Sequence, residues 1–169
     1  MDKVILVDKN DNEIGTEEKL KTHQEGKLHR AFSIFIFNSS DQLLIQKRVQ
    51  TKYHSGGLWS NTCCSHPKPG EDILSAAHLR LKEEMGFDCD LKEIGNFIYQ
   101  KKFSNGLTEY EYDHILIGYS NIRPNINKKE VEDWKWIDPD KLKNDVEKNP
   151  EEYTYWLKIS LCNVLSIKN

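Results

Sequence analysis

Short apolar runs bounded by polar, turn-forming residues occupy the first part of the chain and predict β-strands. Residues 3–7 read as a short strand that the polar cluster 8–12 closes. Residues 31–37 are rich in β-branched and aromatic side chains, which is typical of a buried strand. The polar segment 38–41 predicts a turn into a second strand at 43–47, so these two strands should form a hairpin.

Helical periodicity follows over residues 73–85, where apolar side chains recur at every fourth position, at Ile73, Ala77, Leu81 and Met85. Gly86 comes directly afterwards and can adopt the left-handed conformation that ends a helix. Between the hairpin and this helix, residues 49–70 contain several glycines and prolines and are predicted to be mostly irregular.

The second half of the chain predicts long strands at 93–103 and 108–119, joined by Ser104-Asn105-Gly106, and a further strand at 134–137. Asp138-Pro139 and Asn149-Pro150 each have the pattern of an N-cap followed by proline at the first helical position. A last helix is expected over 150–166. Strands interleaved with helices predict an α+β fold in which helices cover a mixed sheet.

Composition and charge narrow the class of protein. With 169 residues, 37% hydrophobic and 30% charged, the chain suits one folded domain over residues 1–169. A net charge of -3 argues against a nucleic-acid or membrane-surface protein, so an anionic ligand must be held by a local pocket. No apolar run approaches the roughly 20 residues of a membrane span. The four irregularly placed cysteines are interpreted as reduced thiols of a cytoplasmic protein.

Paired carboxylates in one predicted strand are the most informative chemical feature. Glu109 and Glu111 are two residues apart, so both should project from the same face. Carboxylates so close repel each other unless a cation or a proton lies between them. The alternative is a solvated face of an edge strand.

Histidines and a cysteine could complete a site with these carboxylates. In an extended segment, Cys64 and His66 would also share a face, although a lone cysteine is commonly a small core residue. His23 and His29 flank a short polar segment and could each be surface histidines. Together with Glu109 and Glu111, the three histidines make a plausible five-ligand site for a divalent metal. No role is assigned to the other three histidines, which are His54, His78 and His114.

Charged residues elsewhere in the chain suggest binding sites for a second cation and for an anion. Glu83 and Glu84 lie late in the predicted helix, where the helix dipole disfavours acidic groups, so they either bind a cation or form a solvated helix end. The candidates for phosphate contact are basic residues that could each also be solvated surface charges: Lys19, Arg48, Lys52 and Arg80.

At this point the chain resembles a known family. Glu71 followed by residues 81–87 resembles a degenerate Nudix box, which runs Gly, five residues, Glu, seven residues, then Arg-Glu-aliphatic-x-Glu-Glu-x-Gly-aliphatic. Counting back from Gly86 places Ser65 at the first glycine and Leu79-Arg80 at the Arg-Glu pair. Nudix hydrolases use that pair to organise their metals, so its loss makes a hydrolase the weaker interpretation.

Three further segments are similar to type 1 isopentenyl-diphosphate isomerases: residues 29–33, 61–67 and 109–111. The similarity extends from about Asp2 to Trp156. It implies a Nudix-like α/β/α sandwich with a mixed sheet. It also implies an enzyme of isoprenoid biosynthesis that interconverts isopentenyl diphosphate and dimethylallyl diphosphate. The expected partner is this small diphosphate substrate, and the expected assembly is a monomer or small homo-oligomer.

The resemblance also implies roles for individual residues. Those similar to the family's metal ligands are His23, His29, His66, Glu109 and Glu111, which would hold Mn²⁺ or another divalent ion. Cys64 and Glu111 resemble the paired acid and base, with Glu111 favoured as the first proton donor. Glu84 resembles the carboxylate that holds Mg²⁺ together with the diphosphate. The four basic residues match diphosphate-binding positions, and Tyr99 and Trp156 match aromatic residues that line the pocket.

The sequence departs from the family pattern at two places. Two other functions also remain as alternatives. The spacing between His23 and His29 is short, and Ser55-Gly56-Gly57 stands where many members have an aromatic-Pro-Gly turn. The other functions are a Nudix-type pyrophosphohydrolase and a metal-stabilised binding module. The binding module would keep its function after Cys64→Ser, whereas the isomerase would lose almost all turnover.

Overall fold

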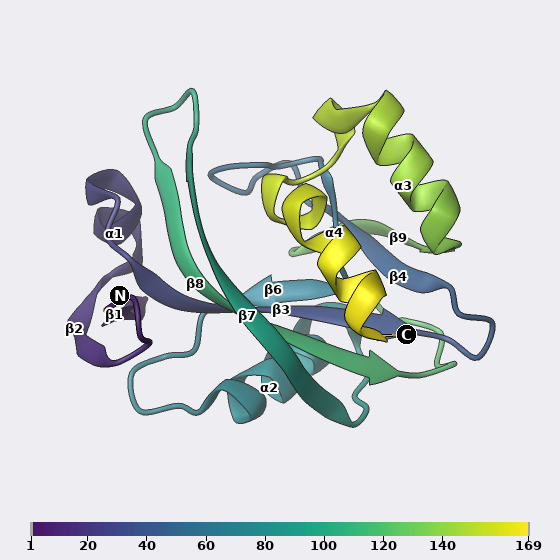
Figure 1. Cartoon of the computed structure of the whole chain (residues 1–169), viewed down its shortest axis with the longest axis horizontal. Coiled ribbons are helices and arrows are strands. Elements are labelled where there is room, and N and C mark those ends of the chain that lie inside the picture. Colours follow the sequence, from purple (N-terminus) through teal and green to yellow (C-terminus); the bar gives the residue numbers. More distant parts are fainter. Residues whose placement is uncertain (1, 169) are drawn as a thin grey trace.

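The computed structural model describes residues 2–168 as one curled sheet with helices on both faces (Figure 1). The strands are β1 (Lys3–Val7), β2 (Glu13–Glu18), β3 (His29–Phe37), β4 (Leu43–Arg48), β5 (Trp59–Ser60), β6 (Cys63–Ser65), β7 (Leu91–Lys102), β8 (Thr108–Tyr119) and β9 (Val131–Ile137). The helices are α1 (Lys19–Glu25), α2 (Ile73–Met85), α3 (Pro139–Lys148), a 3₁₀ turn (Pro150–Glu152) and α4 (Tyr155–Lys168).

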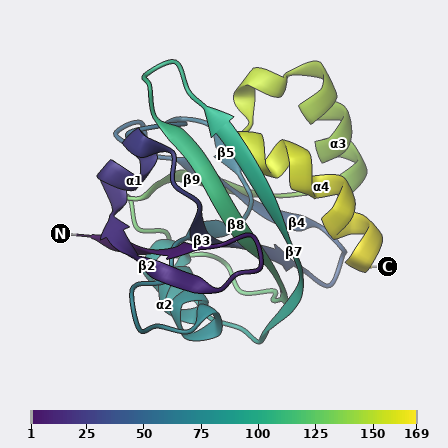
Figure 2. The ribbon, with the colours of Figure 1, turned by 60° about the vertical axis from the view of Figure 1, so that its left-hand side comes forward.

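Strand β3 lies at the centre of a mixed sheet. It pairs in parallel with β8 over its whole length, from His29 opposite Glu111 to Phe37 opposite Tyr119. Its other partners, β1, β4 and β6, run antiparallel to it. Strands β7 and β8 form a long hairpin whose tip extends beyond the rest of the sheet (Figures 1 and 2). A mixed sheet was predicted, and it is confirmed.

The core has two layers because β3 is buried on both faces. Phe32, Ile34 and Ile36 pack against α2, whereas Phe35 and Phe37 point to the opposite face and pack against α4. Side chains alternate along a strand, so a continuous apolar run such as residues 31–37 supplies both layers. The arrangement is an α/β/α sandwich, with α2 on one side and α3 and α4 on the other (Figure 1).

The predicted helix over 73–85 is confirmed at both ends. Asp72 caps its start by accepting a hydrogen bond from the Ser75 N–H (3.0 Å). Gly86 ends it in the left-handed region with φ of 72°. Any larger residue here would place its Cβ 2.2 Å from the Asn125 carbonyl oxygen, so glycine is required by space as well as by conformation.

Several elements differ from the predictions. Strand β2 and helix α1 were not predicted, and residues 49–70 contain the short strands β5 and β6. The last helix begins at Tyr155 rather than at residue 150. Asn149 makes no side-chain cap, and the intervening backbone pairs instead with Trp59, whose carbonyl accepts from the Thr154 N–H (2.9 Å). Tertiary pairing therefore overrides the local N-cap pattern.

Candidate active site

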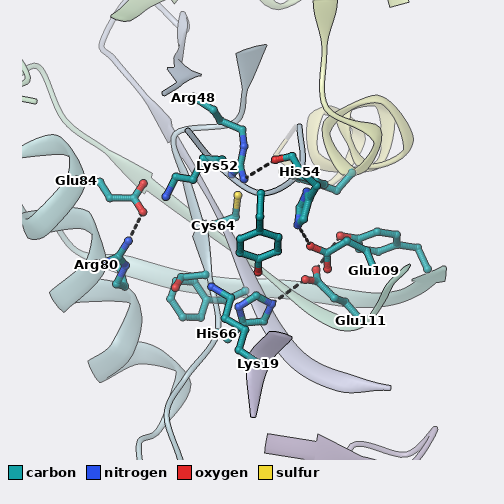
Figure 3. Close-up of a pocket in the computed structure, with 15 residues that line it drawn as sticks. Lys19, Arg48, Lys52, His54, Cys64, His66, Arg80, Glu84, Glu109 and Glu111 are labelled. Carbon is teal, nitrogen blue, oxygen red and sulfur yellow. Dashed lines mark hydrogen bonds and ion pairs between the residues drawn. The ribbon is translucent and has the colours of Figure 1, made fainter. Parts of the chain in front are cut away.

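A cavity of about 80 Å³ opens between the β7–β8 hairpin, the loop after β4, α2 and the start of α4. Its lining includes eleven of the residues predicted from the sequence: Lys19, Arg48, Lys52, Cys64, His66, Arg80, Glu84, Tyr99, Glu109, Glu111 and Trp156. In Figure 3, Glu84 and Arg80 from α2 lie on one side of Cys64, and the two strand glutamates lie on the other.

Five of the predicted metal ligands converge at one end of this cavity. Candidate ligand atoms of His23, His29, His66, Glu109 and Glu111 all lie within 4.8 Å of one another. Glu109 and Glu111 project from the same face of β8, as their spacing predicts, and they are only 3% and 7% exposed. A solvated edge-strand face is therefore excluded for this pair.

Strand pairing explains how the ligands meet. The parallel register of β3 and β8 places His29 directly opposite Glu111. The antiparallel strand β6 brings His66 beside them, with its Nε2 2.8 Å from Glu111 Oε1. Helix α1 contributes His23, which is completely buried and lies 3.3 Å from Glu109 through Nε2. The short interval between His23 and His29 is spanned by the end of α1 and a tight left-handed turn at Gly26.

The free atoms of this cluster fit a divalent metal. The Nδ1 atoms of His23 and His29 lie 2.6 and 2.8 Å from the carbonyl oxygens of Lys19 and Lys27, so the neutral form of each ring carries its proton on Nδ1 and offers Nε2 to the cluster. Both Nε2 atoms and Glu109 Oε2 are buried without a hydrogen-bond partner. Buried polar atoms without partners are rare, and three imidazoles with two carboxylates suit a borderline divalent ion.

Protonation states in the cluster follow from burial and from the carboxylates. Burial lowers the pKa of His66 to about 4, although Glu111 opposes this effect. For His23, burial lowers the pKa but Glu109 outweighs it, so the pKa is raised. Burial would raise the pKa of Glu109, yet its contacts with Glu111, His23 and His54 hold it well below the usual range. Glu109 is therefore ionised and His66 neutral at physiological pH, as metal ligation requires.

Cys64 and Glu111, the predicted acid and base, both reach the cavity. Burial raises the pKa of the Cys64 thiol to about 12, with Arg48 opposing, so the sulfur carries its proton at neutral pH. The Tyr99 hydroxyl donates to Glu111 Oε2 (2.7 Å), while His66 contacts Oε1. Both oxygens of Glu111 are thus held by neighbours that can exchange protons or orient the carboxyl group.

Basic side chains line the cavity on several sides, as an anionic ligand requires. Lys19, Arg48, Lys52 and Arg80 all line it, and burial lowers the pKa of Lys19 although Glu109 opposes that shift. Among the two helix glutamates, Glu83 is exposed and Glu84 is buried. Glu84 accepts hydrogen bonds from Arg80 (2.5 Å) and from Gln46 Nε2 (2.9 Å). These donors hold its carboxylate at the cavity wall and explain an acidic group late in the helix without further assumptions.

His54 was missed by the sequence analysis. It is 8% exposed, lines the cavity and places its Nε2 2.5 Å from Glu109 Oε1 (Figure 3). One local signal could have identified it, namely the neighbouring Gly56-Gly57 pair. A Cβ at Gly56 would lie 2.5 Å from the Gln50 carbonyl oxygen, so the loop folds back tightly and carries His54 inward. The other two unassigned histidines contact carboxylates outside the cavity, His78 with Asp88 and His114 with Glu93 and Asp11.

Comparison with known proteins agrees with this arrangement. The model of the NUDIX domain matches residues 27–157. An Aromatoleum aromaticum protein named isopentenyl-diphosphate Delta-isomerase 2 is 52% identical over 168 residues, covering 99% of this chain and 89% of the relative. A Photorhabdus laumondii protein of the same name is 52% identical over 170 residues, covering 100% of this chain and 96% of the relative.

Solved structures support the fold. A crystal structure from Deinococcus radiodurans superposes with a TM-score of 0.80 at 17% identity, covering 96% of this chain and 98% of that one. The MutT protein from Methanosarcina mazei gives a TM-score of 0.67 at 13% identity, covering 80% and 91%. At such identities the likeness concerns the fold alone.

Within residues 2–168, no helix is both long and apolar enough to cross a membrane.

Proposed function

This chain belongs to the NUDIX domain family and, within it, to the isopentenyl-diphosphate Delta-isomerases, and we propose that it interconverts isopentenyl diphosphate and dimethylallyl diphosphate by metal-dependent proton transfer. It is an enzyme, and its reaction serves isoprenoid synthesis. The observation that carries the metal-dependent mechanism is the convergence of five ligand atoms within 4.8 Å, three of which come from residues that line one cavity with Cys64.

The reaction moves one proton onto the substrate and removes another. Protonation of the terminal alkene carbon leaves positive charge on the tertiary carbon, and loss of a proton from the neighbouring carbon forms the new double bond. We assign these two transfers to Cys64 and Glu111, since both line the cavity. An alkene is a weak base, so the donor must be placed close to it in a site that excludes water.

The order of the two transfers depends on which group holds a proton when substrate binds. The resemblance to the isomerase family favours Glu111 as the first donor. The raised pKa of Cys64 means that its thiol also begins with a proton, so a cycle that starts at Glu111 requires Cys64 to ionise on binding. A cycle that starts at Cys64 needs no such step, and the experiment below separates the two.

The residues at the two ends of the cavity divide the remaining tasks. A Mn²⁺ or similar ion held by His23, His29, His66, Glu109 and Glu111 would supply positive charge that tunes the proton affinity of Glu111. On the side of α2, Mg²⁺ held by Glu84 and the diphosphate would join the basic residues around the cavity in neutralising the substrate. A five-carbon substrate has little apolar surface, so these charged contacts must provide most of its binding energy.

Aromatic side chains protect the cationic intermediate. Trp156 is buried, and it lines the cavity together with Tyr99 and Phe32. Such a lining leaves little room for water, which would otherwise capture the tertiary cation. The indole face can stabilise that cation by about 2 kcal/mol once both are desolvated.

The test is incubation of the purified protein with isopentenyl diphosphate, Mg²⁺ and Mn²⁺ in deuterated water, followed by NMR. Dimethylallyl diphosphate that carries deuterium in a methyl group is expected. Unchanged substrate, with cleavage of a nucleoside diphosphate derivative instead, would favour a pyrophosphohydrolase. A Cys64→Ala variant then identifies the first donor. Exchange of the vinyl hydrogens with deuterium, without product formation, requires a donor other than Cys64. The absence of such exchange assigns the first proton transfer to Cys64.

A further inference from the structure

His54 is the one buried histidine at the cavity, within residues 2–168, that the five-ligand cluster leaves without a role. Its contact with Glu109 is specific to one oxygen. Nε2 of His54 lies 2.5 Å from Oε1, whereas Oε2 is buried without a hydrogen-bond partner and faces Nε2 of His29 at 3.9 Å. Oε1 also lies 3.3 Å from Nε2 of His23, so the two oxygens of Glu109 have different surroundings, and Oε2 is the one without a hydrogen-bond partner.

The imidazole of His54 is held rigidly enough to impose this difference. Its ring stacks on Phe103 with centroids 4.8 Å apart and an interplanar angle of 10°. The rings of Tyr53 and Trp156 meet it edge to face at 4.9 and 5.9 Å. Nδ1 lies 3.3 Å from Ser55 Oγ. With packing on several sides and a polar neighbour at Nδ1, the ring has little freedom to turn Nε2 away from Glu109.

The loop that carries His54 is itself anchored at both ends of the cavity. Arg48 donates from Nε to the Ser55 carbonyl (3.2 Å) and from Nη2 to the His54 carbonyl (3.4 Å). On the other side, the Asn105 amide at the tip of the β7–β8 hairpin donates to the Tyr53 carbonyl (2.8 Å). The loop thus links the basic end of the cavity to the strand that bears Glu109.

We propose that His54 is a positioning residue that holds Glu109 Oε1 and so aims Oε2 at the metal, without being a ligand itself. This inference rests on the metal centre of the proposed function. Outer partners that orient a ligating carboxylate commonly change metal affinity by 10–100-fold when they are removed. His54 also lies outside the compact group of five ligand atoms, which is consistent with an orienting role.

Two substitutions separate this role from packing and from direct ligation. His54→Phe keeps an aromatic ring that can stack on Phe103 but removes the nitrogen that contacts Glu109. His54→Gln supplies an amide N–H that can donate to Oε1, yet a neutral amide nitrogen cannot replace an imidazole as a ligand. His114→Phe is the matched control, because His114 is similarly buried (7% exposed) and in contact with carboxylates, but lies outside the cavity.

The measurement is titration of the metal-free proteins with Mn²⁺ by calorimetry, with urea unfolding in a chelator as the check on folding. We expect the Mn²⁺ dissociation constant to rise about 10–100-fold in His54→Phe, to recover largely in His54→Gln, and to stay unchanged in His114→Phe. Equal weakening in the Phe and Gln variants would make His54 a ligand and overturn the proposal, as would wild-type affinity in His54→Phe. A wild-type protein that binds no Mn²⁺ would instead refute the metal centre, and the role of His54 with it.

Discussion

Replacement of Trp156 tests whether the indole face stabilises the cationic intermediate. The ring is 4% exposed, and its Nε1–H donates to Ser60 Oγ (3.0 Å) and Asn61 Oδ1 (3.2 Å). The Arg48 guanidinium lies 5.2 Å from the ring centroid. Trp156 therefore has two separable functions, which are to offer a π face to the cation and to support a side chain that binds diphosphate.

The two functions predict different kinetic effects. Trp156→Leu removes the π face, and loss of about 2 kcal/mol of cation–π stabilisation lowers kcat about 30-fold. Trp156→Phe keeps a weaker face, so its kcat should fall only about 5-fold. Because a phenyl ring can still support Arg48 and leucine cannot, KM should rise mainly in the leucine variant.

Stability should change by a similar amount in both variants. Ser60 Oγ also accepts from the Thr154 hydroxyl (3.1 Å), and Asn61 Oδ1 also accepts from Ser60 (2.9 Å), so neither acceptor is left without a partner when the indole is removed. A lost hydrogen bond and a modest cavity together cost about 1–3 kcal/mol.

Steady-state kinetics with isopentenyl diphosphate, combined with urea unfolding, provide the comparison. If the ring face stabilises the cation, kcat falls further in Trp156→Leu than in Trp156→Phe, while the free energies of unfolding of the two variants remain close. If both variants lose the same factor in kcat, the ring face contributes nothing to the transition state and the effect of Trp156 is packing alone.

Three further predictions concern the metal cluster. Exhaustive chelation should abolish isomerase activity, and Mn²⁺ or Mg²⁺ should restore it; full activity in a chelator would contradict the metal-dependent mechanism. Glu109→Gln should raise the Mn²⁺ dissociation constant without unfolding the domain, as calorimetry and circular dichroism would show, whereas a lost fold would indicate a structural site. Because the folded pKa of His66, about 4, lies below its unfolded value of 6.5, the unfolded chain takes up the proton first, and the metal-free protein should lose about 3 kcal/mol of stability as the pH falls from 6.5 to 4. Urea unfolding across that range should show a smaller loss in His66→Gln, and an identical loss would mean that His66 is not buried in its neutral form.

Local patterns predicted the elements whose stability is mainly local. Helix α2 has its apolar period, its Asp72 cap and its terminal glycine within one continuous segment, and its predicted bounds match the structure. Strand β2, in contrast, is an acidic segment without a buried residue, which forms a strand only because it pairs with β1. Helix α1 has seven residues, too few for its own periodicity to mark it, so its packing beside β8 is what places it.

The residues of the candidate site also fall into two groups, those predicted by local sequence and those positioned by tertiary contacts. Strand alternation alone puts Glu109 and Glu111 on one face, and the family-like segments around them mark Cys64, His66 and the basic residues in advance. The convergence of His23, His29 and His66 on that face, and the inward turn of His54, depend on the pairing of β3 with β8 and on loops that close over it. Periodicity within a segment determines which way a side chain points, whereas contacts between segments distant in the chain determine which side chains meet. The candidate ligands were therefore identifiable from the sequence, whereas the geometry that brings them together was decided by the tertiary fold.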